Sequence, residues 1–335
     1  MSAPDDPTSV QPDDPGPGPG GPALGHVHPH ARAEDDPNAP PRLGIVGGGP
    51  VGRTLARAFS RAGWPVAAGA SRSETGRAAL AAAVPGMPVF AEAVAVLDEV
   101  EICFLTVPDD ALRGLAGRLH LYGGQALVHT SGLLDAAVLE PALAAGTLKG
   151  SFHPLVAFAE PVRALAALAG ATIAIEGDPP LVPLLAQLAE AIGGQPVRLP
   201  PGAKPAYHAA AVLAAGGLIG LYEAIVVLGQ AAGLDEPSAV AIYAPLSRQA
   251  LADAQALGVA GALTGPIVRG DVGTLRAHLE ALRRLAPGAL AVYRAVAAQE
   301  LALAIRRGAL EPTRARAIGE LLAEAGSDQE PGGTP

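Results

Sequence analysis

The chain has 335 residues, half of them hydrophobic, which is enough apolar material for the cores of two domains. Its formal charge is −9, and residues 1–41 account for −6 of it because they hold seven acidic residues against one arginine. The remaining body, at −3, has no basic run. Its charge therefore gives no reason to expect nucleic acid as a partner.

Residues 1–41 contain 11 prolines and five glycines but few large apolar side chains, a composition that cannot offset the entropy of ordering. We interpret them as a disordered tail and residues 326–335 as a second one. His26, His28 and His30 alternate and could chelate a transition metal weakly, but a solvated tail is the favoured interpretation. We therefore expect no metal site.

The only cysteine, Cys103, lies in an apolar run, which rules out a disulfide within the chain or a cysteine-based metal site. The N-terminus lacks the charged start and apolar core of a secretory signal. We therefore expect a cytoplasmic protein.

From Leu43 onward, short apolar runs alternate with helix-length segments, which is typical of a parallel sheet with crossover helices. This predicts an α/β fold in which residues 42–201 form an N-terminal Rossmann domain with a doubly wound sheet. The predicted strands are Leu43–Val46, Val66–Ala70, Val89–Phe90, Ile102–Val107, Ala126–His129 and Leu148–Phe152, extended by Ala171–Ile175 and Pro196–Leu199 on either side of a helix at Leu181–Ile192.

Strand signals stop after Gly202, so residues 202–325 are predicted to form an all-helical C-terminal domain. Its first helix, from about Pro205 to Ala232, is apolar on nearly all faces, which requires surrounding protein. Its uncharged stretch Ala209–Tyr222 has 14 residues, fewer than the roughly 20 that span a bilayer. We therefore expect a buried helix, no membrane association, and a homodimer built through this domain.

A glycine motif follows the first predicted strand. Gly47, Gly49 and Gly52 form G-x-G-x-x-G between an apolar strand and a helix. In this context the glycines allow a tight turn, a close approach of pyrophosphate and packing of the helix on the sheet, while the helix N-terminus attracts phosphate. Residues 42–201 are therefore predicted to bind a nicotinamide dinucleotide, with Pro50 and Val51 also at the site.

The end of the second strand indicates which dinucleotide. NAD sites usually carry an acidic residue there, whereas this chain has Ser71, Arg72 and Ser73. Hydroxyls and a guanidinium suit a 2′-phosphate, which favours NADP(H). The alternative is an exposed Arg72 beside a capped helix.

The end of the fourth strand adds to this site. Val107 and Pro108 are expected to line the cofactor, and Asp109 is interpreted as a helix cap rather than a catalyst.

These motifs, with four others, resemble the Rossmann-like proteins that carry a C-terminal DUF2520 domain, in the 6-phosphogluconate-dehydrogenase-like superfamily. The resemblance covers about residues 42–325 and implies a fold and a cofactor class but no settled substrate. The other motifs are His129-Thr130-Ser131-Gly132, Ser151-Phe152-His153-Pro154-Leu155, Lys204-Pro205-Ala206-Tyr207-His208, and residues 264–271 with Thr274 and His278.

Relatives of defined activity include pyrroline-5-carboxylate reductase, ketopantoate reductase, prephenate dehydrogenase and the 3-hydroxyisobutyrate dehydrogenases. Ser131 followed by His153 is similar to the serine and histidine that address substrate in prephenate dehydrogenases. Lys204 is similar to the helix-start lysine of hydroxyisobutyrate-type dehydrogenases. The asparagine expected four residues later is replaced by His208, which shares a helix face with Lys204.

The resemblance implies Lys204, His208, His153 and Ser131 as catalytic candidates, since hydride reduction of a carbonyl or imine needs a proton donor. For the substrate we expect contacts from Thr264, Arg269 and His278, with Arg269 holding a carboxylate; a loop in which Asp271 caps the next helix and pairs with Arg269 is equally expected.

The predicted function is an NADP(H)-dependent oxidoreductase acting on a small carboxylate-bearing 2-oxo acid, imine or related hydroxy compound. The first alternative is a non-catalytic NADP(H)-binding sensor or partner protein, and a second is reduction of another cofactor such as a deazaflavin.

Overall fold

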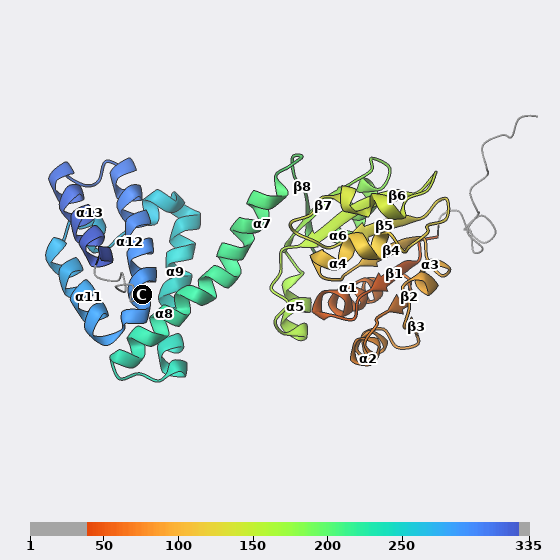
Figure 1. The fold of residues 1–335 in the computed structure, drawn as a ribbon, viewed down its shortest axis with the longest axis horizontal. Coiled ribbons are helices and arrows are strands. Elements are labelled where there is room, and N and C mark those ends of the chain that lie inside the picture. The colour runs from red at the N-terminus through yellow and green to blue at the C-terminus, as the bar shows by residue number, and fades with distance from the viewer. Residues whose placement is uncertain (1–38, 328–335) are drawn as a thin grey trace, which may run out of the picture. The chain divides into compact units, whose positions relative to one another are not determined.

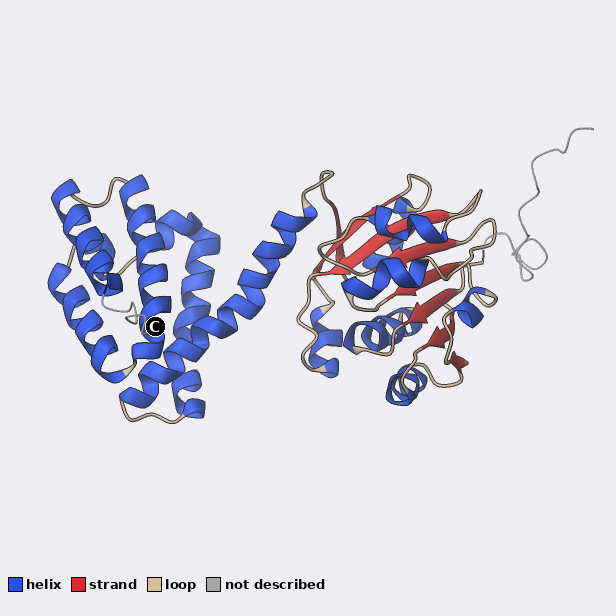
Figure 2. Ribbon diagram, viewed as in Figure 1, coloured by secondary structure: helices blue, strands red, loops and turns tan. Residues whose placement is uncertain are grey.

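The computed structural model describes residues 39–327 (Figure 1). The chain divides into two compact units, with the boundary between Ala211 and Val212 in the sequence. Strands occur in the first unit, and the described part of the second consists of helices and their connections (Figure 2). The predicted combination of a Rossmann domain and an all-helical C-terminal part is confirmed.

The first unit is built on one eight-stranded sheet in the order β3-β2-β1-β4-β5-β6-β7-β8. Its strands are β1 (Leu43–Val46), β2 (Val66–Ala70), β3 (Val89–Phe90), β4 (Ile102–Leu105), β5 (Ala126–His129), β6 (Leu148–Pro154), β7 (Thr172–Gly177) and β8 (Gln195–Arg198). Its helices are α1 (Pro50–Arg61), α2 (Glu74–Ala83), α3 (Val94–Leu97), α4 (Asp109–Ala116), the 3₁₀ helix η2 (Ala136–Ala142), α5 (Pro161–Ala167), α6 (Val182–Ala191) and α7 (Lys204–Val212).

The sheet departs from the predicted parallel arrangement at one place, because β7 runs antiparallel to β6. The connection through α5 brings the chain back to the end of the sheet at which β6 finishes, and β7 starts there beside it. Pro154 pairs with Ile173 and Gly150 with Gly177.

The fourth predicted strand, Ile102–Val107, also ends early, at Leu105. The Thr106 hydroxyl lies within hydrogen-bond distance of two carbonyl oxygens, those of Val46 (3.1 Å) and Gly47 (3.0 Å). These contacts tie the chain to the turn after β1, and Pro108 then precedes α4.

Apolar side chains cover both faces of the sheet. Phe59, Phe104 and Phe152 are fully buried on the face that α1, α2 and α6 cover, and their ring centroids lie 5.2–5.9 Å apart. The other face packs against α3, α4 and η2. This sandwich fixes the strand ends, from which the polar residues of the site project.

The second unit contains a π-helical turn (Leu213–Gly217), α8 (Leu218–Ala231), α9 (Glu236–Ala262), α10 (Pro266–Arg269), α11 (Val272–Leu285), α12 (Pro287–Arg306) and α13 (Pro312–Ser327). Its core gathers leucines of α11, α12 and α13. The predicted helix at 205–232 is present as α7, the π turn and α8, and Gly258 interrupts α9 with a φ of +75°.

Three helical segments are long and apolar enough to cross a membrane: Lys204–Ala231, Glu236–Arg269 and Pro287–Arg306. Only 11% of the most apolar window of the first is buried, so a single copy does not provide the burial that the sequence predicts. Leu213 is 73% exposed and Ile219 is 70% exposed. An exposed apolar surface of this kind marks an interaction site.

We expect a second copy of the chain to cover this surface, so that sedimentation equilibrium gives about twice the chain mass. Leu213→Glu combined with Ile219→Glu should shift the equilibrium to monomer, because carboxylates would have to be buried. Val162→Glu is the matched control, since Val162 is 68% exposed on α5 in the other unit. A wild-type monomer at micromolar concentration, or flotation with lipid vesicles, would contradict this prediction.

Candidate functional site

The turn between β1 and α1 has the geometry expected of a pyrophosphate loop. Gly47 has a φ of +120°, which glycine adopts without strain. A Cβ on Gly52 would collide with the Gly47 carbonyl oxygen and the Thr106 hydroxyl, so only glycine lets α1 start this close to the sheet. A Cβ on Gly49 would meet nothing within 4 Å. The turn is thus open at Gly49, and no side chain caps the first N–H groups of α1.

The loop after β2 combines the two interpretations considered for it. Ser73 caps α2, accepting a hydrogen bond of 3.1 Å from the Gly76 N–H. Arg72 is exposed, and its guanidinium has no hydrogen bond or ion pair with any residue between 39 and 327. It is therefore free to meet a ligand.

Arg77, which the sequence analysis missed, supports this loop. Its Nη1 donates to the carbonyl oxygens of Ser71 (3.1 Å) and Arg72 (2.9 Å). An arginine one turn after a helix cap was the available signal, since such a side chain reaches back over the N-terminus. Arg77 brings a second positive charge to the loop.

Ser131 follows β5 and connects two elements. Its hydroxyl donates to Asp109 Oδ2 (2.8 Å) and accepts from the N–H groups of Leu133 (3.1 Å) and Leu134 (2.9 Å). The interpretation of Asp109 as a helix cap is wrong, because Pro108 occupies the cap position of α4 and the Asp109 carboxylate turns to Ser131 instead. The serine hydroxyl thus already makes its hydrogen bonds with groups of the chain.

His129, at the end of β5, is fully buried. Its Nδ1 accepts a hydrogen bond from the Ser131 N–H (3.1 Å), so its proton sits on Nε2, which donates to the Asp135 carbonyl oxygen (3.1 Å). Burial lowers the pKa of His129 to about 3. His129 belongs to a motif of the sequence but was not predicted to have a role of its own. Through these two hydrogen bonds it holds the loop that carries Ser131.

Lys204 begins α7 and is 5% exposed. Its amine donates to Ser151 Oγ (2.6 Å) and to the Leu134 carbonyl oxygen, and it lies 3.7 Å from Glu176 Oε2. Burial lowers the pKa of the amine, and the charge of Glu176 opposes the shift. The ammonium thus makes two hydrogen bonds and one ion pair with groups of the chain.

Glu176, on β7, was not predicted as a site residue. Its second oxygen, Oε1, accepts from the Ala136 N–H (3.3 Å). Nothing in the sequence distinguishes Glu176 from other acidic residues at the end of a strand, so its role could not be predicted.

His153 on β6 and His208 on α7 meet above Gly132. A nitrogen of each ring lies within 2.7 Å of the point where a Cβ on Gly132 would stand, so a larger residue there would displace both rings. The ring centroids are 5.8 Å apart, and Tyr207 packs 6.0 Å from His153. Burial, with smaller effects of His208 and Lys204, lowers the pKa of His153 to about 4.

Three buried polar atoms of these rings have no hydrogen-bond partner within residues 39–327: His153 Nδ1, His208 Nδ1 and Tyr207 OH. Unpaired buried polar atoms are costly, so these rings mark a candidate place for a ligand that supplies hydrogen bonds. The structure thus brings together four predicted residues, Lys204, His208, His153 and Ser131, at one end of the sheet.

The predicted substrate residues of the second unit do not form a comparable cluster. Thr264 and Arg269 are exposed beside the short helix α10, which replaces part of the expected loop. Asp271 caps α11 through the Thr274 N–H (3.0 Å). His278 Nδ1 lies 2.8 Å from Tyr293 OH.

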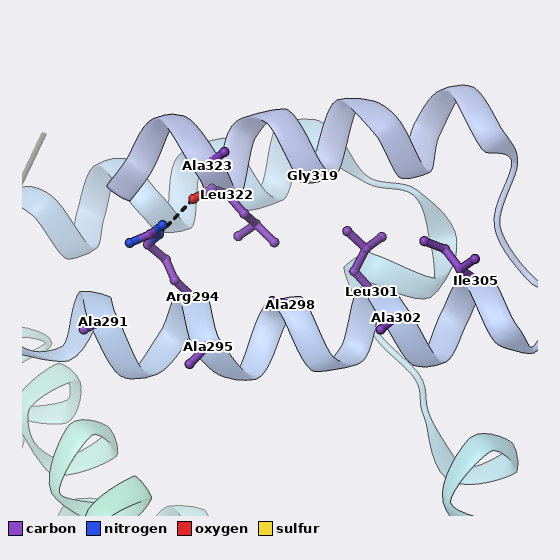
Figure 3. A pocket seen from close by; sticks show the side chains of 10 residues that line it. All are labelled: Ala291, Arg294, Ala295, Ala298, Leu301, Ala302, Ile305, Gly319, Leu322 and Ala323. Carbon is purple, nitrogen blue, oxygen red and sulfur yellow. Dashed lines mark hydrogen bonds between the residues drawn. The ribbon is translucent and has the colours of Figure 1, made fainter. Parts of the chain in front are cut away.

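A separate groove of about 560 Å³ lies between α12 and α13 (Figure 3). Alanines and other apolar residues line it, with Arg294 at one end donating to the Leu322 carbonyl oxygen (2.8 Å). None of the predicted site residues lines it. Between residues 39 and 327 no group of three or more His, Cys, Asp or Glu side chains could hold a metal ion.

Comparisons with known proteins agree with this architecture. Residues 29–154 match the Rossmann-like domain, and residues 171–300 match the Domain of unknown function (DUF2520). No curated protein matches the chain.

This chain covers nearly the whole length of several solved structures that have a similar fold. Protein TM1727 from Thermotoga maritima is 28% identical, with a TM-score of 0.60, covering 79% of this chain and 99% of that one. A putative NADP oxidoreductase, BF3122, from Bacteroides fragilis is 20% identical, with a TM-score of 0.63 and coverage of 78% and 98%. The imine reductase from Pseudomonas sp. is 18% identical, with a TM-score of 0.60 and coverage of 85% and 99%.

The buried His129 generates a prediction about acid stability. Its pKa in the folded chain, about 3, lies below its unfolded value of about 6.5, so the unfolded chain binds more protons between these pH values. Unfolding free energy should therefore fall as pH falls through this window, by up to about 1.4 kcal/mol per pH unit from this residue.

His129→Asn, which keeps an acceptor for the Ser131 N–H, should flatten this dependence in urea unfolding measured between pH 7 and pH 4. His120→Asn is the control because His120 is exposed. An unchanged slope in His129→Asn would show that His129 is not held neutral.

Proposed function

Because the chain belongs to the family of Rossmann-like proteins that carry a DUF2520 domain, we propose that it is an oxidoreductase using NADP(H). Its substrate in this proposal is a small carboxylate-bearing 2-oxo acid, an imine or a related hydroxy compound. One observation carries the proposal: the open glycine turn and the cluster of unpaired polar atoms follow parallel strands of one sheet. The carboxyl ends of β1, β4, β5 and β6 meet at the same edge, where doubly wound folds bind ligands.

The named relatives support this proposal. The Bacteroides fragilis structure is described as a putative NADP oxidoreductase and the Pseudomonas structure as an imine reductase. Further neighbours include a 1-pyrroline-5-carboxylate reductase from Streptococcus pyogenes and a reductive aminase from Aspergillus terreus in complex with NADPH.

The residues present fit a dinucleotide. Gly47, Gly49 and the free N–H groups of Val51 and Gly52 would hold the pyrophosphate beside Pro50, Val107 and Pro108 would line the nicotinamide side, and Ser71 with Arg72 would hold the 2′-phosphate. Bound NADP(H) would supply or accept the hydride. Arg77 would keep the carbonyl groups of the 2′-phosphate loop turned away from that anion.

The contacts distinguish roles among the four catalytic candidates. His153 and His208 present unpaired nitrogens and are proposed to contact the substrate. Ser131 is proposed to orient Asp109. That Lys204 acts on the reacting group stays a prediction; its contacts support a role in holding Leu134 and Ser151 in place.

The completed hydrogen bonds of Ser131 and Lys204 favour a second candidate, an NADP(H)-binding sensor without turnover. Screening the purified protein with NADPH against small oxo acids and imines separates the two. For either candidate we propose a cytoplasmic homodimer that uses neither nucleic acid nor a membrane.

We expect NADP(H) to bind at least about tenfold more tightly than NAD(H), which corresponds to about 1.4 kcal/mol. Arg72→Ala and Arg77→Ala should each narrow this difference by weakening NADP(H) binding alone, measured by fluorescence titration. Arg118→Ala, at an exposed arginine after α4, is the control. Equal affinities of the wild type for both dinucleotides would overturn the assignment.

Lys204→Ala should leave NADP(H) binding nearly intact and lower turnover by about 10²-fold or more, whether the amine acts directly or holds the site. Lys204→Arg should be nearly as damaging, because a planar fork does not fit three oxygens around one nitrogen. Turnover within a few-fold of wild type in either variant would remove Lys204 from the site.

A further inference from the structure

We propose that the reacting group of the substrate is a cation, an iminium carbon–nitrogen double bond, rather than a neutral carbonyl. This narrows the proposed function to one of its substrate classes and rests on it. Three features of the site support it: the charges that face the cluster, the hydrogen bonds that Lys204 already makes, and the carboxylate oxygen of Asp109 that is left without one.

Carboxylates outnumber cations around the cluster. Asp109 of α4, Asp135 after β5 and Glu176 of β7 all act on Lys204 of α7, the one basic side chain with a contact there among residues 39–211. The other titratable groups are His129 of β5, His153 of β6, and Tyr207 and His208 of α7. His129 and His153 have pKa values of about 3 and 4 and are neutral at pH 7. This excess of negative charge favours a cationic ligand.

The positive charge of Lys204 is not available to an anionic ligand. Its amine is directed to Leu134, Ser151 and Glu176, and moving it to a substrate anion would leave these buried oxygens unpaired. An alkoxide formed from a carbonyl would therefore develop near carboxylates without a free cationic donor.

Asp109 is positioned to receive the cation. Its Oδ2 accepts the Ser131 hydroxyl (2.8 Å), which orients the carboxylate. Its other oxygen has no hydrogen bond within the described part of the chain, and the residue is exposed at the edge where α4 begins. An iminium N–H directed to this oxygen would form a charge-assisted hydrogen bond.

The electron balance of the reaction fits a site in which His129 and His153 are neutral at pH 7. An iminium carbon would accept a hydride, with its electron pair, from NADPH as the reductant, and a carbon–hydrogen bond would form. The π pair of the carbon–nitrogen bond becomes the lone pair of a neutral amine, so this step needs no proton. A carbonyl would need one, and Tyr207, whose pKa is raised by burial, is a weak acid for that purpose.

The first test is equilibrium binding, with piperidinium and its neutral isostere tetrahydropyran as probes, measured by NMR titration with and without saturating NADP⁺. Piperidinium should bind at least about tenfold more tightly. Asp109→Asn, which can still accept from Ser131, should abolish this preference. Asp110→Asn, the same change one residue along α4, should retain it.

Equal binding of the two probes to the wild type, or an unchanged preference in Asp109→Asn, would overturn the inference. If NADP⁺ does not bind at all, the proposed function fails. The inference is then judged separately, from the preference for piperidinium over tetrahydropyran measured without dinucleotide. Where turnover is found, 1-pyrroline should be reduced with a kcat/KM at least about tenfold above that of cyclopentanone. Faster reduction of the ketone would overturn the inference while leaving the oxidoreductase in place.

Discussion

The site depends on one buried ammonium group. Lys204 places its amine among a backbone carbonyl, a serine hydroxyl and a carboxylate that come from three different segments: the loop after β5, strand β6 and strand β7. Breaking such a contact would leave the remaining polar atoms buried without partners. The start of α7, with Tyr207 and His208 on its following turn, is thereby fixed against the end of the sheet.

Two imidazoles at this edge, those of His129 and His153, are neutral at pH 7. Burial is the larger influence that lowers their pKa values, and the positive charge of Lys204 adds to it. The neighbouring carboxylates do not cancel the effect, because Glu176 is held at the amine and Asp109 is turned to Ser131. Neighbouring side chains thus differ in state: His129 and His153 are neutral, whereas Glu176 pairs with Lys204 and Asp109 accepts a hydrogen bond from Ser131.

Much of the fold could be predicted from the sequence, because the strands are uninterrupted apolar runs and the glycine motif lies between the first of them and a helix. The direction of β7 could not, since an apolar strand has the same residue pattern whether it runs parallel or antiparallel to its neighbour. Long-range polar partners were the harder part of the site. In the sequence Asp109 has the pattern of a helix cap. Only the fold shows that the Ser131 hydroxyl, 22 residues later, donates a hydrogen bond to its carboxylate.

Lysine is rare in this chain, where arginine takes nearly every other basic position. Only Lys149 and Lys204 are lysines among 23 basic residues, and both lie at the β6–β7 pair, Lys149 beside Asp178 (3.6 Å) and Lys204 beside Glu176 (3.7 Å). A tetrahedral ammonium can direct its protons to oxygens arranged around one point, whereas a guanidinium presents its donors in a plane. The two hydrogen bonds and the ion pair of Lys204 thus suit an ammonium group, irrespective of whether its proton ever reaches a substrate.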